Sequence, residues 1–476
     1  MNWRFQFFVM ILNTTLAFSK IPDRFQQLVN QGEYTSAQQS MRQYLASEPS
    51  LSIESKLAIQ FEIERLDRIR KDFTKIKTEV ISNIKQYLPD VTDADIERWE
   101  QARSLEYKII DGQKRYFNWA ANNLFRIDSE AKAAKTKLQS TSNSDQTYYT
   151  RTNYVTQLIE RYQTNQQIMP QRFQITYTLA VNPDAVPTGR TIRCWLPYPL
   201  EIANRQTDIQ LLNTTPARHI ISDNHDYLQR SVYLENIATK GTPTKFQVSF
   251  AYTNYPAYVP IDAAKVRPAT ITADLEPFIA ERPPHIFFTP EMRQLGKEIV
   301  GSETNPYRIA QLLFAWVDQH IPWASAREYS TFQNISEYVR VNRHADCGMQ
   351  TIFFMTLCRM YDIPTRWQSG WRTEPDEENM HDWGEIYFEP YGWVPVDVTN
   401  GLLQSSNPQV KWFFLSGMDA YRLIVNDDYS QQLYPAKMYF RSETLDFQRG
   451  EVEWEGGNIY FDQWDYEFAV KRVSGK

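Results

Sequence analysis

Apolar residues recur at helical spacing along the first third of the chain, through residues 20 to about 165. On either side of Gln31 and Gly32 they return every three or four positions, which predicts two helices joined at this break. The Asp-Gly pair inside 107–116 is typical of the tight turn of a β-hairpin. We therefore expect a helical domain over 20–165 that contains one short hairpin.

The pattern changes to strict alternation of apolar and polar residues over 173–181 and again over 246–252. Such alternation predicts strands with one buried face, and the proline and glycine residues between the segments predict turns. A stretch of this length with several strands favours a β-sandwich domain over 168–262.

Residues 285–400 contain segments with helical spacing as well as segments with strand-like alternation, which predicts an α+β core. Helical spacing extends around 309–317 and again from Cys347 toward Pro364, while 381–388 and 393–398 alternate as strands. Proline disfavours helix in the residue before it, so the second helix should end ahead of Pro364.

The remaining segment, 401–476, holds aromatic, strand-like pieces at 437–440 and 458–461. It predicts a β-rich C-terminal extension. The expected fold class is thus a multi-domain protein with an α-helical N-terminal region, a β-sandwich middle domain, an α+β core and this extension.

Length and charge agree with several domains and narrow the choice of partners. Single hydrophobic cores stop growing at about 250–300 residues, and the chain has 476. Its 51 basic and 57 acidic residues give a net charge of −6, with no basic stripe. We therefore expect no nucleic-acid partner, although a helix followed by a hairpin could otherwise suggest a winged DNA-binding unit.

The first residues have the pattern of a signal peptide, 1–19. Arg4 precedes a short apolar run, and Ala17 to Ser19 fits the small-residue cleavage rule. No apolar stretch approaches the roughly 20 residues of a membrane-spanning helix. We expect an exported protein, periplasmic or extracellular, and the alternative is an apolar start to a cytosolic helix.

Export makes the three cysteines informative. Cys347 and Cys358 are separated by about 16 Å along one predicted helix, and a disulfide needs Cα atoms within about 7 Å. Cys194 lies far away in a strand-like segment, so one distant disulfide stays possible but three cysteines cannot all pair. At least one thiol should be free, and Cys194 and Cys358 are most simply core residues.

Cys347 is the candidate nucleophile because it lies where a helix N-terminus is expected. The unpaired N–H groups and the dipole at such an end stabilise a thiolate, and Asp346 is a suitable N-cap. His381 begins one strand and Asp397 ends the next, so a hairpin would bring the two side chains together. A thiol, an imidazole and an orienting carboxylate are the components of nucleophilic acyl transfer.

The order of these residues, with "RMYDIPTRWQSGW", "HDW" and "GWVPVDVTNG" around them, resembles the transglutaminase-like superfamily over about 310–402. The resemblance implies a papain-like fold with Cys347 as nucleophile, His381 as general base and Asp397 as the residue that orients it. Many members carry glycine where this chain has Ala345, and Val341 stands at the position of the papain oxyanion glutamine. Asn342 or Trp323 would then supply the second oxyanion donor.

Other interpretations of these residues remain open. Trp383 either floors a substrate groove or belongs to the core, and Asp382 is expected on a solvated strand face. A zinc site built from Cys347, Cys358 and nearby histidines is disfavoured because the two thiols lie about three helical turns apart. We expect no cofactor.

The resulting hypothesis is an exported cysteine acyl-transfer enzyme acting on amide bonds of peptides or proteins, possible cell-envelope material included. Hydrolysis is favoured over crosslinking. The alternative is a non-catalytic peptide-binding or scaffold protein that retains a papain-like groove.

Overall fold

The computed structural model describes residues 21–138, 143–164, 169–374 and 377–473, so the predicted signal peptide lies outside the described residues. The chain forms two compact units. Unit 1 comprises the residues up to Tyr148 together with Arg282–Phe287 and Gln319–Gln350, and unit 2 comprises Tyr149–Glu281, Phe288–Asp318 and Thr351–Lys476.

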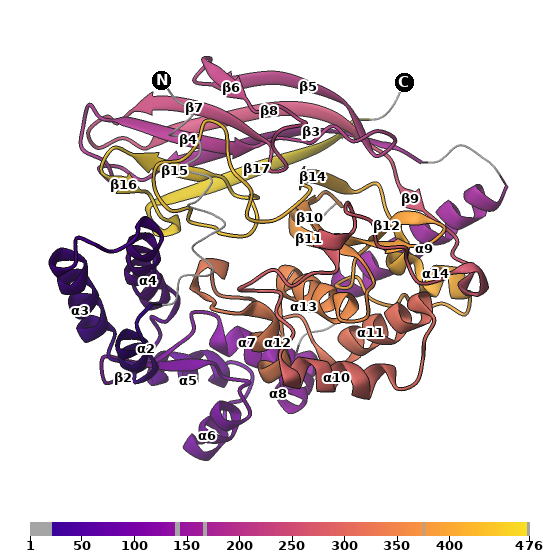
Figure 1. Ribbon diagram of the computed structural model, residues 1–476, viewed down its shortest axis with the longest axis horizontal. Coiled ribbons are helices and arrows are strands. Elements are labelled where there is room, and N and C mark those ends of the chain that lie inside the picture. The colour runs from indigo at the N-terminus through magenta and orange to yellow at the C-terminus, as the bar shows by residue number, and fades with distance from the viewer. Residues whose placement is uncertain (1–20, 139–142, 165–168, 375–376, 474–476) are drawn as a thin grey trace. The chain divides into compact units, whose positions relative to one another are not determined.

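Unit 1 is mainly helical and has one hairpin (Figure 1). Its elements within the first part of the chain are α2 (Asp23–Asn30), α3 (Tyr34–Ser47), α4 (Ile53–Asp72), α5 (Lys77–Lys85), α6 (Asp93–Gln101), β1 (Tyr107–Ile110), β2 (Gln113–Tyr116), α7 (Ala120–Ile127) and α8 (Ser129–Leu138). Helix α12 (Ile335–Asn342) comes from the later segment. The apolar faces of the early helices meet in one hydrophobic cluster that extends from Phe25 to Ala131.

Local signals in this region predicted the structure correctly. The break between α2 and α3 lies at Gln31 and Gly32, and Gly32 has a φ of 79°, a backbone conformation that favours glycine. Strands β1 and β2 pair antiparallel, with Ile110 opposite Gln113 across the Asp-Gly turn. Both predictions rested on contacts between residues close in sequence.

Unit 2 contains two antiparallel sheets that contribute to one hydrophobic cluster. One sheet has the order β17-β3-β8-β5 and the other β16-β15-β4-β7-β6. The strands are β3 (Gln171–Val181), β4 (Thr191–Pro197), β5 (Gln206–Thr215), β6 (His219–Ile221), β7 (Ser231–Ile237), β8 (Thr244–Asn254), β15 (Glu451–Trp454), β16 (Gly457–Asn458) and β17 (Trp464–Val473).

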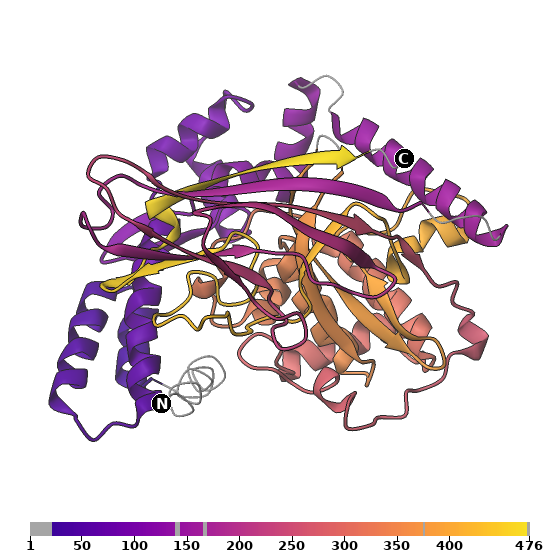
Figure 2. The same ribbon diagram turned by 90° about the horizontal axis from the view of Figure 1, so that it is seen from above.

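The C-terminal strands complete both of these sheets. Strand β17 pairs with β3 along its whole length, and β15 pairs with β4 (Figures 1 and 2). The expected strands at 437–440 and 458–461 were wrong, since the first segment is a loop and only Asn458 of the second lies in a strand. Aromatic content suggested strands there, but these residues fill space beside the sheets instead.

A third sheet of unit 2 has the order β12-β11-β10-β14. Its strands are β10 (Thr365–Arg372), β11 (Asn379–Phe388), β12 (Gly392–Val396) and β14 (Arg422–Asn426). Helix α13 (Cys347–Arg359) enters unit 2 from unit 1, and its aromatic residues Phe353 and Phe354 contact the rings of α11 (Pro306–His320). This sheet carries His381.

The other elements are short or link these parts: α9 (Asn143–Gln163), α10 (Pro290–Val300), α14 (Pro408–Lys411), β9 (Ala257–Tyr258) and β13 (Gly417–Met418). The predicted mixture of helices and several sheets is confirmed, while the five predicted segment boundaries stay predictions. Among the described residues, none of the helices combines the length and hydropathy that a membrane crossing requires.

Candidate functional site

His381 and Asp397 are joined by a hydrogen bond between buried atoms. His381 lies near the start of β11 and Asp397 directly follows β12, and these strands form a hairpin in which Gly384 pairs with Val396. The His381 Nε2 to Asp397 Oδ2 distance is 2.7 Å. Continued by one residue, this register would set Asp397 opposite Trp383, so His381 lies two positions away along the neighbouring strand, within reach of the carboxylate.

This hydrogen bond fixes the tautomer of the imidazole. An ionised carboxylate can only accept, so His381 carries its proton on Nε2 and donates it to Asp397. The lone pair of the neutral ring is then on Nδ1. A general base of this kind would receive a proton at Nδ1.

Asp397 is held by three further donors. The backbone N–H and the side-chain amide of Asn400 donate to its two oxygens, at 3.1 and 3.0 Å. Arg422, from β14, places Nη2 at 3.0 Å from Asp397 Oδ2 and also bonds Asp419. These contacts leave the carboxylate a single orientation.

Burial and charge set the ionisation of the pair. Burial raises the pKa of Asp397, but His381 and Arg422 more than offset this and hold it below its usual value. Burial lowers the pKa of His381 to about 4, and Arg372 and Arg422 act in the same direction against Asp397. Near neutral pH the pair is therefore a carboxylate and a neutral imidazole.

Asp382 is buried, which corrects the expectation of a solvated side chain. It is 3% exposed, and Gln448 donates from Nε2 to both Asp382 Oδ1 and the His381 carbonyl. Burial and the neighbouring Asp382 raise the pKa of Asp446 well above its ordinary value, and the Asp446 side chain hydrogen-bonds Asp382. The expectation was wrong because the C-terminal segment covers the strand face on which Asp382 lies. The alternation of apolar and polar residues along the strand predicted that face as solvated.

Cys347 is the first residue of α13, and its side chain is half-buried. The predicted N-cap is present: Asp346 Oδ1 accepts from the backbone N–H of Met349 at 3.0 Å. The Tyr329 hydroxyl donates to the same oxygen at 2.8 Å and fixes the cap. The unpaired backbone N–H groups at the start of α13 thus include that of Cys347, the candidate nucleophile.

The other two cysteines are core residues, as expected. Cys194 and Cys358 are fully buried, and burial raises the pKa of both thiols well above the ordinary value. Cys194, Cys347 and Cys358 all lie among the described residues and form no disulfide, so the distant disulfide left open by the sequence is absent. Within the described ranges no cluster of histidine, cysteine and acidic residues could hold a metal ion.

The residues considered for the oxyanion site have different surroundings. Asn342 donates its side-chain amide to the Tyr338 carbonyl within α12. Trp323 is 40% exposed, and its backbone forms a parallel bridge with Ala345. Trp383 is fully buried against the His381 ring and donates to Gln368, which favours the core interpretation over the groove floor.

The structure therefore brings His381 and Asp397 together, while Cys347 falls in unit 1 and its approach to the imidazole stays a prediction. Sequence reasoning missed Asn400, Arg422 and Gln448. Asn400 lies only three positions after Asp397 and bonds it locally, so its nearness in the sequence was the signal that could have found it. Arg422 and Gln448 come from distant segments and have no local signal.

Papain-like cysteine enzymes combine a histidine and an orienting side chain on an antiparallel sheet with a cysteine at the start of a helix. This chain has all of these parts: His381 joined to the buried Asp397, and Cys347 at the start of α13. Residues 293–398 match the family model described as the transglutaminase-like superfamily. This part of the chain belongs to that superfamily and contains Cys347, His381 and Asp397. No curated protein compared with the chain matches it.

Several solved structures are similar to the chain at low identity. A proposed cysteine protease from Cytophaga hutchinsonii is 14% identical with a TM-score of 0.42, over 65% of this chain and 92% of that one. The periplasmic domain of TgpA from Pseudomonas aeruginosa is 14% identical with a TM-score of 0.28, over 51% of this chain and 90% of that one. The same domain bound to ethylmercury is 12% identical with a TM-score of 0.28, over 56% and 97%.

Proposed function

We propose that the protein is an exported cysteine acyl-transfer enzyme in which Cys347, His381 and Asp397 act as a catalytic triad. The observation that carries the proposal is the buried hydrogen bond from His381 Nε2 to Asp397 at 2.7 Å, which leaves the lone pair on Nδ1. The position of Cys347 at a capped helix N-terminus supports the role of nucleophile.

The reaction would proceed in two halves. His381 Nδ1 takes the thiol proton, the sulfur attacks an amide carbonyl, and the C–N bond breaks as the amine leaves with that proton. Water, deprotonated by His381, then attacks the thioester carbonyl, the C–S bond breaks, the carboxylic acid leaves, and the proton returns from His381 to the Cys347 sulfur. Attack by an amine instead of water would give crosslinking.

The oxyanion of the tetrahedral intermediate would be stabilised by the backbone N–H of Cys347. A second donor would come from Trp323 or its neighbours, since the Asn342 amide is already bonded within α12. Loss of one such donor typically costs about 3 kcal/mol of transition-state stabilisation. The rate thus depends on whether this second donor is supplied.

For the substrate we propose amide bonds of peptides or proteins, cell-envelope material included, with hydrolysis as the main outcome. The signal-peptide pattern of residues 1–19 supports export. The alternative, a peptide-binding scaffold with the same core, requires no reaction at Cys347.

The proposal is tested by the pH dependence of Cys347 alkylation with iodoacetamide in the full chain. Assistance from His381 should give reaction near pH 6 to 7, whereas an ordinary thiol has a pKa of about 8.5. His381→Ala should shift the profile to that of the ordinary thiol, and His225→Ala, at an exposed histidine, should leave it unchanged. Identical profiles for the native chain and His381→Ala would refute the triad.

A second measurement separates the outcomes of the reaction. Labelled casein should be cleaved by the native chain and not by Cys347→Ala. When a fluorescent primary amine is added, the amount of amine incorporated into casein by the native chain should be smaller than the number of peptide bonds cleaved. Binding of casein by both proteins without cleavage or incorporation would favour the scaffold alternative.

A further inference from the structure

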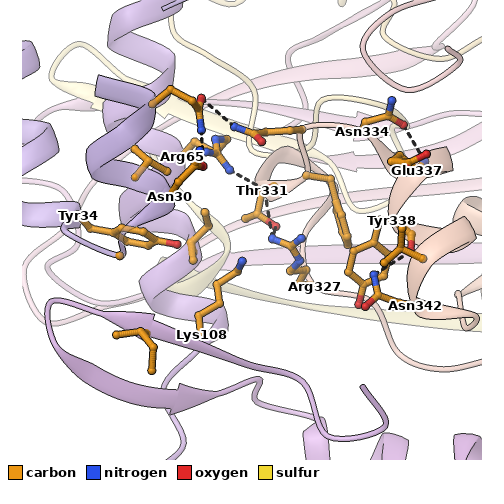
Figure 3. A pocket seen from close by; sticks show the side chains of 18 of the residues that line it. Asn30, Tyr34, Arg65, Lys108, Arg327, Thr331, Asn334, Glu337, Tyr338 and Asn342 are labelled. Carbon is orange, nitrogen blue, oxygen red and sulfur yellow. Dashed lines mark hydrogen bonds between the residues drawn. The ribbon is translucent and has the colours of Figure 1, made fainter. Parts of the chain in front are cut away.

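Unit 1 contains a cavity of about 630 Å³, a volume typical of small-molecule sites. It lies between α2, α3 and α4, the β1 hairpin strand and the segment that leads into α12. Three cationic side chains line it, Arg65, Lys108 and Arg327, beside the aromatic rings of Tyr34 and Tyr338 (Figure 3).

Two of these cations are anchored by the protein. Arg65 forms a bidentate pair with Glu62 at 2.6 and 2.7 Å, and it donates to the Thr331 carbonyl. Arg327 donates to that same carbonyl and lies 3.6 Å from Glu106. Both guanidinium groups therefore have a fixed position at the cavity wall.

Arg327 is nevertheless incompletely satisfied. Its side chain is 8% exposed, and its buried Nε lies 3.6 Å from Glu106 Oε1, too far for a hydrogen bond, with no hydrogen-bond acceptor among the described residues. The guanidinium carbon lies 3.9 Å from the centre of the Phe332 ring, a cation–π contact that holds the group against the ring. A buried donor without an acceptor is unfavourable unless a ligand or water supplies one.

Lys108 is the cation without a salt bridge among the described residues, although Glu106, two positions earlier in the chain, attracts it at longer range. It extends from β1, and the described part of the chain offers its ammonium group no ion pair, only the Phe73 ring at 5.5 Å. Burial together with Arg327 and Arg65 lowers the pKa of Lys108 to about 8. Figure 3 shows its nitrogen turned into the same space as the Arg327 guanidinium, with the Tyr34 hydroxyl directed toward it.

The other acidic side chains near the cavity do not fully cancel the positive charge of Lys108. Glu337 also lines the cavity, but it is paired with Arg340 on its own helix. Burial raises the pKa of Asp72, which is close enough to interact with Arg327, to about 7, so it contributes only part of a charge. Arg65 lies opposite Glu62 and Arg327 opposite Glu106, so Lys108 is the cation left over. Asp72 offsets part of its charge, so the cavity wall carries an excess of at most one positive charge.

We propose that this cavity binds a small organic monocarboxylate, with the carboxylate at Lys108 and Arg327 and the body of the ligand against the aromatic rings. One excess positive charge matches a monoanion better than a phosphate dianion. The bonding needs of the unpaired guanidinium N–H and the ammonium group are both met by carboxylate oxygens. The site is formed within unit 1 and does not depend on the reaction proposed for Cys347.

Isothermal titration calorimetry of the full chain with N-acetylalanine and with its uncharged amide tests the proposal. We expect the acid to bind at least tenfold more tightly than the amide and than inorganic phosphate. Lys108→Gln should weaken binding of the acid at least tenfold, and Lys85→Gln, the same charge change at an exposed lysine outside the cavity wall, should leave it within twofold.

Equal binding of acid and amide, binding of neither, or tighter binding of phosphate would overturn the proposal, and these comparisons need no variant. Undiminished binding by Lys108→Gln would overturn it as well. Lys108→Arg, which keeps the charge, should retain most of the affinity if the site is as described.

Discussion

Arg422 Nη2 lies 3.0 Å from Asp397 Oδ2, and neither side chain is exposed to solvent. The same nitrogen lies 3.0 Å from Asp419 Oδ2, so one guanidinium compensates two buried carboxylates. Removal of one partner of a buried ion pair leaves an uncompensated charge, which is strongly destabilising. Arg422 therefore supports both the stability of this sheet and the ionisation of Asp397.

Replacement of Arg422 tests that relationship. Arg422→Met should lower the free energy of unfolding by about 3–5 kcal/mol and raise the pKa of Asp397, which moves the acid limb of the pH–rate profile to higher pH. Arg267→Gln breaks an exposed ion pair with Glu389 and should cost less than about 1 kcal/mol. Denaturant unfolding and the pH–rate profile check both. An unmoved acid limb in Arg422→Met would show that Arg422 is only structural.

Asp397→Asn should impair the reaction through the tautomer of His381. An amide can donate to Nε2, which would leave the ring proton on Nδ1, where the thiol proton must be received. A corresponding substitution in a serine protease lowers kcat by about 10⁴, and we expect a loss of similar order in casein cleavage. Asp465→Asn, at an exposed position of β17, should keep full activity. Activity within tenfold of the native chain would exclude the orienting role.

The contribution of His381 to stability should fall as the pH is lowered from about 6.5 toward 4, while Asp72 and Asp446, whose pKa values are raised by burial, act in the opposite direction. Burial lowers the pKa of His381 to about 4, so in this window the unfolded chain binds a proton that the folded chain does not. The contribution lost from this group is about 3 kcal/mol. Burial also lowers the pKa of His285 to about 3, which extends the decline to lower pH. Thermal unfolding of the native chain and of His381→Gln between pH 4 and 7 isolates the His381 contribution, because the stability of the native chain relative to the variant should decrease as the pH is lowered.

Gly370 should not tolerate a side chain. A Cβ atom there would lie 1.8 Å from the Leu423 carbonyl oxygen, at the point where the pairing of β10 with β14 shifts register. Gly370→Ala should therefore separate β14, and Arg422 with it, and give insoluble or unfolded protein. Gly296→Ala is the control, because its nearest neighbours are the ends of the flexible Met360 and Tyr361 side chains. Equal thermal midpoints for the two variants would contradict the close approach.

The predictions that succeeded at the candidate site concern residues close in sequence. Asp346 and the helix it caps, and the hairpin that joins His381 to Asp397, follow from caps, periods and turns that act over a few residues. Arg422 reaches the pair only because β14 adds to the far edge of β10. No short-range pattern records which strand adds to an edge.

The same limit explains the errors in the C-terminal segment. Strand β17 was not predicted from the sequence, and its partner β3 lies almost 300 residues earlier in the chain. Asp382 was expected in solvent because its strand alternates, but Gln448 and Asp446 arrive from that distant segment to cover it. Alternation shows that the two faces of a strand differ in polarity, but it does not identify the segment that packs against either face.

The pairing of β17 with β3 also fixes the order in which this part of the protein can mature. During synthesis β3 leaves the ribosome long before β17 exists, so its outer edge stays open until the last segment of the sheet has been made. An open edge of that length is a site for misassembly with other chains. For a chain threaded unfolded across a membrane, such late completion would be an advantage, because the sheet could not close on the wrong side.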